Sequence, residues 1–166
     1  MSLGLDRSSK EASVLLKFVL VYESKYGNTK RVAEAIAEEM RQVGGTEVTL
    51  STLKAVDIDD VVDCDVILLG GPTHFGGPTR GVRKFIDALG KRNVNGKSVA
   101  VFDTYLGEDF EKGVRKMEEQ IRAKAPGLRL GVPGLSIRVQ GMKGPIAEGE
   151  LAKWRDFVKQ LVTQRD

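Results

Sequence analysis

The sequence predicts an α/β protein with a five-stranded parallel sheet of order 2-1-3-4-5 and helices on both faces. Short apolar runs that suit buried strands alternate with longer segments whose apolar residues recur at helical spacing. Glycines and Gly/Pro clusters end most of these segments. Strands that alternate with helices pair in parallel through crossover connections, and the crossovers cover both faces of the sheet.

Strands are expected at residues 18–22, 47–52, 66–69, 98–102 and 128–139, the last one interrupted by Pro133 and Gly134. Residues 57–62 are expected to form a linker or a helical turn. The four expected helices have these apolar stripes: Val32, Ile36, Met40 and Val43; Val82, Phe85, Ile86 and Leu89; Phe110, Val114, Met117 and Ile121; and Leu151, Trp154, Phe157, Val158 and Leu161. Trp154 is therefore expected in the core rather than at a ligand.

At 166 residues the chain is expected to form one domain over 16–166, after a polar, disordered lead-in at 1–15. No apolar run approaches the roughly 20 residues that a membrane-spanning helix needs, so no membrane is expected. The single cysteine, Cys64, cannot form an internal disulfide and is expected in the core. Nothing demands an oxidising compartment, and a cytoplasmic protein is expected.

The charge balance raises the question of nucleic-acid binding, because 26 Lys and Arg residues against 23 Asp and Glu residues leave a net charge of +3. The two signs are interleaved, as in residues 148–156, and there is no sustained basic run. Nucleic-acid surfaces concentrate their basic residues, so no nucleic-acid partner is expected. A metal site is not expected either, because one His and one Cys supply no ligand set.

Residues 24–29, Ser-Lys-Tyr-Gly-Asn-Thr, follow the first strand and open the first helix. The segment offers three hydroxyl groups, the free N–H groups of a helix start, and Gly27, which lets the backbone turn closely around a ligand. These groups suit an anion such as a phosphate. The alternative that Ser24 or Asn28 only caps the helix stays open at this point.

Two further loops are expected at the same edge of the sheet. Residues 70–78, Gly-Gly-Pro-Thr-His-Phe-Gly-Gly-Pro, follow the third strand, and 103–107, Asp-Thr-Tyr-Leu-Gly, follow the fourth. The Gly/Pro density of 70–78 is not expected inside a helix or sheet. Open parallel sheets bind ligands beyond the carboxyl ends of the strands, where the strand order reverses. The order 2-1-3-4-5 therefore brings the three loops together around one site.

Other phosphate-binding architectures lack their motifs in this sequence. There is no G-x-x-x-x-G-K-[ST] and no G-x-G-x-x-G after the first strand, which argues against a nucleotide triphosphatase and a dinucleotide site. A receiver domain would need an Asp at the end of the third strand, where Gly70 and Gly71 stand. A phosphatase of similar architecture would need a Cys in the first loop, whereas Cys64 precedes the third strand.

The loop at 24–29 resembles the [ST]-x-T-G-x-T phosphate loop of flavodoxins, with Tyr26 where those proteins often have Thr. Its Ser-x-Tyr-Gly form is similar to the loop of flavodoxin-like quinone reductases of the tryptophan-repressor-binding-protein family. Residues 70–76 resemble the Gly-x-Pro-Thr-x-Phe-Gly loop that flanks the flavin in that group. The resemblance spans about residues 16–163, and it implies a flavodoxin-like three-layer sandwich that binds flavin mononucleotide (FMN).

The resemblance assigns cofactor-binding residues in each loop. Those expected at the phosphate are Ser24, Tyr26, Gly27, Asn28 and Thr29, with Lys25 adding positive potential. Those expected beside the flavin ring are Pro72, Thr73, His74, Phe75 and Gly76. Those expected in the third loop are Asp103, Thr104, Tyr105 and Gly107. Two alternatives stay open, namely that Tyr105 packs on the surface and that His74 caps a turn or contacts solvent.

The resemblance implies two functions. The first is an FMN-binding protein acting in electron transfer, with a redox partner protein and no catalytic residue of its own. The second is an NAD(P)H-dependent quinone reductase with a small-molecule electron acceptor, and for either a homodimer stays open. The charge of +3 weakens the first, because flavodoxins tend to be acidic. The length weakens the second, because those reductases tend to be longer and tetrameric. A binding module that keeps only the fold ranks last, because all three loops look equipped.

Overall fold

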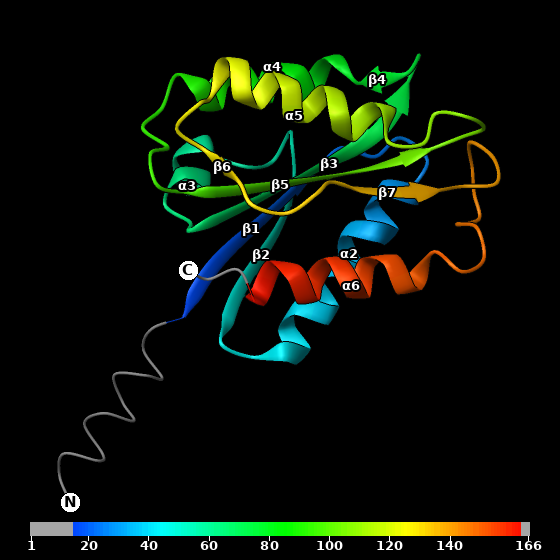
Figure 1. Cartoon of the computed structure of the whole chain (residues 1–166), viewed down its shortest axis with the longest axis horizontal. Helices are drawn as coiled ribbons and strands as arrows, with labels where there is room; N and C mark the ends of the chain where they lie inside the picture. Colours follow the sequence, from blue (N-terminus) through cyan, green and yellow to red (C-terminus); the bar gives the residue numbers. More distant parts are fainter. Residues whose placement is uncertain (1–14, 164–166) are drawn as a thin grey trace, which may run out of the picture.

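A parallel sheet runs through the middle of the described chain, residues 15–163 of a computed structural model (Figure 1). The predicted lead-in lies, but for residue 15, outside the described residues. The strands are β1 (Leu16–Tyr22), β2 (Thr46–Thr52), β3 (Val66–His74), β4 (Gly77–Pro78), β5 (Ser98–Tyr105), β6 (Arg129–Leu130) and β7 (Leu135–Arg138). The helices are α2 (Asn28–Val43), α3 (Ile58–Val62), α4 (Arg80–Gly90), α5 (Lys112–Lys124) and α6 (Leu151–Thr163).

The strand order confirms the predicted fold class. The order is β2-β1-β3-β5-β6, all pairs along it are parallel, and β7 also pairs in parallel with β5. The predicted five strands become seven in the described chain, for two reasons. The fifth strand divides at Pro133 and Gly134 into β6 and β7, which both lie along β5. A two-residue strand, β4, also pairs antiparallel with the end of β3.

Two apolar cores lie on opposite faces of the sheet, because successive side chains of a strand point in opposite directions. Phe18 and Leu20 of β1 pack in one core with residues of α2 and α6, and Trp154 lies there as predicted. Val19 and Val21 pack in the other core with residues of α3, α4 and α5. Figure 1 shows α4 and α5 on one side of the sheet and α2 and α6 on the other. Helices on both faces are thereby confirmed.

Five side chains that were expected in the core are less buried than predicted. Val43, Phe110 and Leu151 are exposed, and Cys64 and Phe85 are half-buried beside the second core. Val43 and Leu151 are terminal residues of α2 and α6, and Phe110 precedes α5. An apolar stripe loses contact with the sheet in the end turns of a helix, so periodicity overestimates the burial of its terminal members.

β3 and β5 are longer than predicted, which corrects the loops assigned at 70–78 and 103–107. β3 continues through the Gly/Pro segment to His74, and β5 continues to Tyr105. Gly70 is required in the strand because a Cβ there would lie 2.1 Å from the ring of Phe102. β1 ends opposite Gly70, so Pro72 has a strand neighbour only on the β5 side. Its other side is an open edge, and β sheets tolerate proline, which lacks an N–H, at such edge positions.

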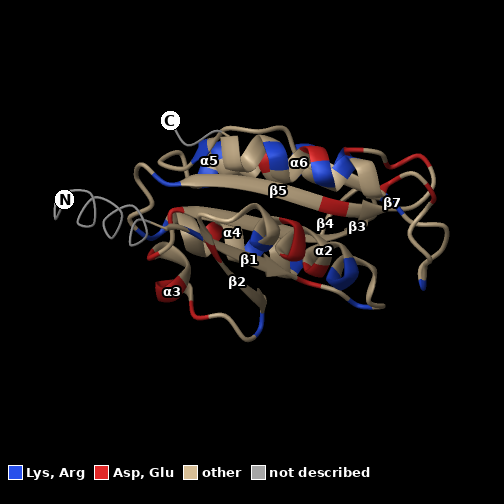
Figure 2. Ribbon diagram, turned by 90° about the horizontal axis from the view of Figure 1, so that it is seen from below, with Lys and Arg blue, Asp and Glu red and all other residues tan. Residues whose placement is uncertain are grey.

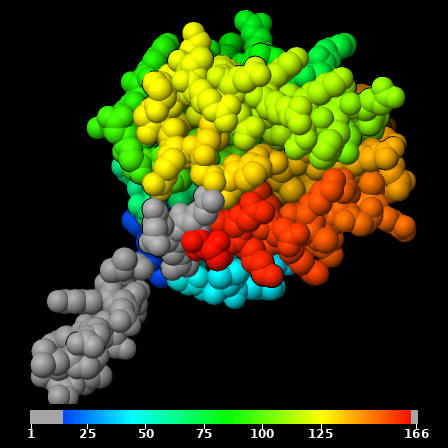
Figure 3. Space-filling model, viewed as in Figure 1, coloured from blue at the N-terminus to red at the C-terminus, as the bar shows by residue number. Residues whose placement is uncertain are grey.

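Charged residues of both signs are spread over the described surface. Figure 2 shows basic and acidic segments mixed along α2 and α6, and acidic segments on α3. The space-filling view shows α5 and α6 on either side of the segment that carries β6 and β7 (Figure 3). Among residues 15–163, none of the helices is long and apolar enough to span a bilayer.

Candidate cofactor-binding site

A cavity of about 500 Å³ lies at the carboxyl ends of β1, β3 and β5. The strand order reverses between β1 and β3, which is where open parallel sheets bind ligands. All three predicted segments contribute to the wall, together with the chain after β7. The lining residues are Ser24, Lys25, Tyr26, Asn28, Thr29, Pro72, Thr73, His74, Phe75, Thr104, Tyr105, Leu106, Asp109, Val139 and Met142.

Four residues predicted for the site do not line this cavity: Gly27, Gly76, Gly107 and Asp103. The three glycines have positive φ angles of 97°, 73° and 62°, so they shape the turns around the cavity rather than its wall. Asp103 lies behind the wall with 0% of its surface exposed. The expectation that Asp103 contacts the cofactor is therefore corrected, because it belongs to β5 and points into the protein.

The start of α2 is left without a side-chain cap. Ser24 instead accepts a hydrogen bond from the Gly27 N–H at 3.1 Å, and the Asn28 side chain donates to the backbone carbonyl of Met142 at 2.9 Å. The alternative that Ser24 or Asn28 caps the helix is therefore wrong. The first N–H groups of an uncapped helix, together with the helix dipole, favour an anion at this position.

Thr29 and Thr104 join the first and third predicted segments through their hydroxyl groups. The two oxygens are 2.9 Å apart, and Thr29 is only 2% exposed. One hydroxyl donates to the other, and the accepting hydroxyl keeps its own hydrogen for a further partner. Since both residues line the cavity, this pair can offer a hydrogen bond to a ligand there.

The wall contributed by β3 ends in a strained hairpin. His74 pairs with Gly77, so Phe75 and Gly76 form a two-residue turn in which both φ angles are positive, 52° and 73°. That conformation normally selects Asn or Gly, and a bulky residue adopts it at a cost of about 1 kcal/mol. Phe75 is nevertheless fully exposed at the margin of the cavity. Strain of this kind is typical of functional positions.

Tyr105 occupies the β5 side of the cavity and is almost completely buried. Its ring meets that of Phe110 at 5.6 Å between centroids with the planes tilted by 59°, a favourable aromatic arrangement. The alternative that Tyr105 packs on the open surface is wrong. His74 also lines the cavity, on an exposed part of its edge.

Four lining residues were not predicted: Leu106, Asp109, Val139 and Met142. Leu106 lies within the third predicted segment, 103–107, and Asp109 lies just beyond it. Val139 and Met142 follow β7, and nothing in their local sequence indicates a site. Their position results from the path of the chain from β7 to α6, which brings Met142 to the Asn28 side chain. Sequence periodicity does not reveal a contact between residues so far apart in the chain.

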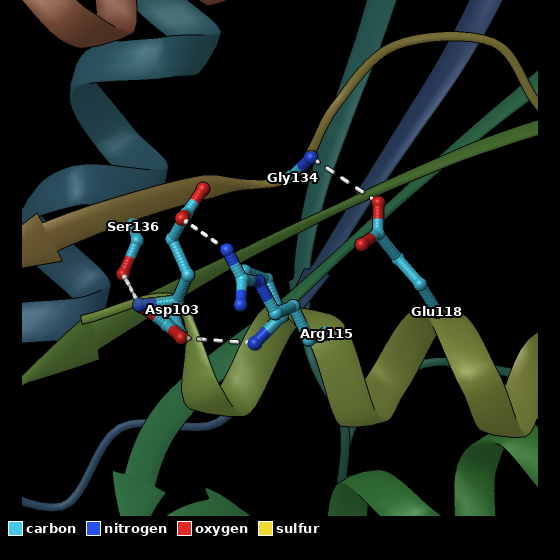
Figure 4. A network of polar contacts seen from close by, with 7 residues as sticks. Asp103, Arg115, Glu118, Gly134 and Ser136 are labelled. Carbon is cyan, nitrogen blue, oxygen red and sulfur yellow. Dashed lines mark hydrogen bonds and ion pairs between the residues drawn. The ribbon is translucent and has the colours of Figure 1, made fainter. Parts of the chain in front are cut away.

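Behind the wall, Asp103 accepts three hydrogen bonds, from the side chains of Thr73 and Ser136 and from the backbone N–H of Val114. Burial raises the pKa of this carboxyl to about 6, although the three hydrogen bonds act in the opposite direction, and the charge of Glu111 raises it further. Figure 4 shows Asp103 and Ser136 of this network at the start of α5. A carboxyl group with a pKa in this range changes its charge close to neutral pH.

An open parallel sheet with a cavity of this chemistry at its switch point defines the class of α/β proteins that bind a mononucleotide at the strand ends. A model of the family described as flavodoxin domain matches residues 19–134. The chain therefore belongs to the flavodoxin domain family, whose members bind FMN. This confirms the family resemblance and agrees with FMN as the expected cofactor.

Curated relatives of two kinds match part of the chain. A flavodoxin of Clostridium saccharobutylicum is 35% identical over 89 residues, which cover 54% of this chain and 56% of the relative. An NAD(P)H dehydrogenase (quinone) of Geobacter sulfurreducens is 30% identical over 115 residues, which cover 52% of this chain and 57% of the relative. The chain thus spans about half the length of the curated relatives it matches.

Among solved structures, oxidised flavodoxin 2 of Bacillus cereus superposes with a TM-score of 0.76 at 27% sequence identity. The superposition covers 89% of this chain and 99% of the Bacillus protein. The similarity therefore extends well beyond the residues that the curated relatives match. It includes the strands and helices that surround the cavity.

The cavity residues fit FMN in chemistry. An uncapped helix start, the Thr29–Thr104 hydroxyl pair and Lys25 suit the phosphate group. Apolar and aromatic side chains suit the flat ring on the β3 and β5 sides, and polar groups there can meet its pyrimidine edge. These ring-side residues are Pro72, Thr73, His74, Phe75, Tyr105, Leu106, Val139 and Met142. No group of three or more metal-ligating side chains occurs among the described residues.

Proposed function

We propose that this chain holds FMN in the cavity between β1, β3 and β5 and acts in electron transfer, passing electrons to a redox partner protein. One observation carries the proposal. A single cavity combines two features. Where α2 begins it has hydroxyl groups and helix N–H groups that no side chain caps, and along β3 and β5 it has an aromatic and apolar wall. Bound FMN would supply reversible uptake of one or two electrons.

In this proposal the phosphate lies at the start of α2. The first N–H groups of the helix and the Ser24 hydroxyl donate to it, and Lys25 adds positive charge. Thr29 donates either directly or after accepting from Thr104. Several donors that are fixed in place before binding reduce the entropy that the ligand loses. The contribution of this segment can be measured separately as the difference in affinity between FMN and riboflavin, because riboflavin lacks the phosphate.

The ring-side wall orients the flavin and excludes water from it. Tyr105 and Phe75 offer aromatic faces on the β5 and β3 sides. Phe75 also faces solvent, so the ring edge next to it stays within reach of an electron donor or acceptor. No side chain of the cavity is assigned a covalent or proton-transfer role in this proposal, since electron transfer needs orientation and proximity only.

An NAD(P)H-dependent quinone reductase is the second candidate. The 30% identity to the Geobacter NAD(P)H dehydrogenase (quinone) and the net charge of +3 favour it. In that case a nicotinamide and then a quinone would approach the same exposed ring edge. Rapid mixing of the FMN-loaded protein with NADH or NADPH separates the two functions. Fast bleaching of the flavin absorbance indicates the reductase, and its absence indicates a carrier that is reduced by another protein.

Thr29→Val tests the phosphate end of the proposal. The variant removes one hydroxyl at constant shape, and we expect FMN binding to weaken by about 1–3 kcal/mol because a donor to a charged group is lost. Riboflavin binding should not change. Thr49→Val, on the exposed side of β2, is the matched control and should bind FMN as the wild type does. Equal weakening for both flavins, or none for FMN, would contradict the assignment of the phosphate.

Binding itself is tested by the spectrum of the purified protein after incubation with FMN. We expect the two-banded absorption of a bound flavin, quenching of FMN fluorescence on mixing, and release of FMN on denaturation. A protein that neither quenches nor shifts added FMN would refute both candidate functions.

A further inference from the structure

Asp103 is a buried carboxyl group directly behind the ring-side wall, and the proposed binding of FMN does not use it. None of its surface is exposed, although the next residue of β5, Thr104, lines the cavity. Burying a charged group in such a position is costly unless the group is hydrogen-bonded, so its hydrogen-bond partners indicate its role.

The partners of Asp103 come from three different segments. Oδ2 accepts from the Thr73 hydroxyl at 3.2 Å and from the Val114 N–H at 3.0 Å, and Oδ1 accepts from the Ser136 hydroxyl at 2.6 Å. Thr73 belongs to the cavity wall at the end of β3. Figure 4 shows Asp103 and Ser136 beside the first turn of α5. One carboxyl group therefore connects the wall to α5 and β7.

The start of α5 is packed closely against the same contact. A Cβ on Gly113 would lie 2.3 Å from the Thr73 hydroxyl oxygen and 2.7 Å from Oδ2 of Asp103. Only glycine leaves room there for the hydrogen bond between Thr73 and Asp103. The position of Thr73 in the wall is thus determined by Asp103 and by the helix start together.

We propose that Asp103 is a positioning residue for the flavin ring: its carboxylate holds the Thr73 side of the wall against α5, and loss of its charge loosens that wall and lowers the affinity for the ring. This inference rests on the proposed function, FMN binding in the cavity. A charge-assisted hydrogen bond is roughly twice as strong as a neutral one, so protonation of Asp103 weakens the anchor of Thr73 without abolishing it.

Protonation can occur without unfolding the site. The Ser136 hydroxyl can rotate to accept from a protonated Oδ1, whereas the Val114 N–H must keep donating to Oδ2. Ser136 already accepts from the Glu111 N–H at 3.0 Å, so its oxygen stays in place while its hydrogen turns away. In its neutral state Asp103 can therefore keep a hydrogen bond to each of the same three partners.

Few charges face Asp103 within the described chain. Glu111, which precedes α5, is the charged side chain that raises its pKa, and Glu111 is itself paired with Arg115 at 2.9 Å. Tyr105 of β5 feels the charge of Asp103 as one of several causes that raise its own pKa, burial first. β3 and β7 present the Thr73 and Ser136 hydroxyls rather than charges. Burial of Asp103 raises its pKa to about 6, so its charge changes within an accessible pH range.

Riboflavin binding to the apoprotein as a function of pH is the test. Riboflavin has no phosphate, whose own second ionisation near pH 6 would obscure the result with FMN. Fluorescence quenching from about pH 5 to about pH 8 gives the affinity. For the wild type we expect a loss of roughly two- to fivefold as the pH falls through 6, the effect of weakening one hydrogen bond. Circular dichroism at each pH shows that the protein stays folded.

Three variants make the test specific. Asp103→Asn mimics the neutral carboxyl, because its oxygen can accept from Thr73 and Val114 while its amide donates to Ser136. It should bind riboflavin at all pH values as weakly as the wild type does near pH 5. Ser136→Ala, which lies outside the cavity, removes a donor that stabilises the carboxylate. It should move the midpoint of the wild-type profile to higher pH. His74→Gln shows whether the cavity histidine causes the pH dependence. Its affinity at about pH 8 is the reference for this variant, and the midpoint of its profile should equal that of the wild type.

The outcomes separate this inference from the function on which it rests. If the wild type binds no flavin at about pH 8, the proposed function fails and the inference fails with it. If riboflavin binds but its affinity is independent of pH, or if Asp103→Asn retains the pH profile, the inference alone is overturned. If Asp103→Asn does not fold, the direction of the midpoint shift in Ser136→Ala decides, and an unshifted midpoint contradicts the role of Asp103.

Discussion

The side-chain amide of Asn28 donates a hydrogen bond to the backbone carbonyl of Met142 at 2.9 Å, across 114 positions of the chain. The contact connects the first residue of α2 with the loop that follows β7. Gly144 lies in the same place, since a Cβ on it would come within 2.7 Å of the Asn28 side-chain oxygen. The segment around Met142 is thereby held as a fourth side of the cavity, next to the proposed phosphate position.

Asn28→Ala should release this fourth side. We expect faster amide hydrogen exchange over residues 140–145 in the apoprotein and FMN binding weakened by about 0.5–1.5 kcal/mol, the net contribution of one such hydrogen bond. Gln42→Ala, an exposed side chain at the far end of the same helix, is the control and should change neither quantity. Exchange over 140–145 that is unaffected by Asn28→Ala would show that the loop does not depend on this contact.

The hairpin of Phe75 predicts opposite effects of one substitution on stability and on binding. Phe75→Asn places a residue that tolerates a positive φ at the turn, so we expect the apoprotein to gain about 0.5–1 kcal/mol of stability in urea unfolding. The same change removes an aromatic face from the cavity, and FMN affinity should fall by about 0.5–1.5 kcal/mol.

Phe75→Leu serves as the comparison, because it keeps the strain and an apolar side chain. Its stability should stay close to that of the wild type while part of the FMN affinity is lost. If Phe75→Asn leaves FMN affinity unchanged, Phe75 does not contact the cofactor, and the strain at this position requires another explanation.

The pKa of Asp103 predicts how the stability of the apoprotein depends on pH. The folded state raises this pKa to about 6 from a value of 3.8, so between these two values the folded protein binds more protons than the unfolded chain. The free energy of unfolding then falls as the pH rises from about 4 to about 6, by roughly 2–3 kcal/mol for this group alone.

The quantity to measure is the difference in unfolding free energy between wild type and Asp103→Asn, because other titrating groups cancel in it. This difference should decline from about pH 4 to about pH 6 and stay constant above. A constant difference over the whole range would mean that Asp103 has an ordinary pKa. Stability and riboflavin affinity are expected to move in opposite directions with pH, whereas partial unfolding would lower both at low pH.

Much of this architecture could be predicted from local pattern. The apolar run of β1 and the apolar stripe of α2 predicted that the segment between them, Ser24–Thr29, forms part of the site. The predicted strand order then placed the segments at 70–78 and 103–107 beside it. The lengths of β3 and β5 could not be predicted in this way. Glycine and proline at 70–72 read as a loop by propensity, whereas the close approach of Phe102 to Gly70 makes them part of the sheet.

Asp103 shows a second limit of sequence reasoning. A polar residue after an apolar strand reads as the first residue of a loop, and only the packing of Thr73, Ser136 and the start of α5 around it reveals a buried carboxyl. Met142 shows a third limit, since its contact with Asn28 depends on the path of the chain and leaves no periodic signal. In each case the missing information is a contact between residues far apart in sequence.

Neighbouring strands of this sheet stop at different heights. β1 ends at Tyr22, opposite Gly70, while β3 continues to His74 and β5 to Tyr105. The cavity lies beyond the end of β1, beside the parts of β3 and β5 that extend further, and forms a step in the sheet edge. The depth of this step therefore depends on how far the backbones of β3 and β5 extend. Side-chain replacements change the chemistry and the local shape of the step but leave the backbone that forms it unchanged. Adding or removing one residue of the overhang would turn every following side chain to the other face, which makes insertions and deletions the changes that would alter which ligand fits.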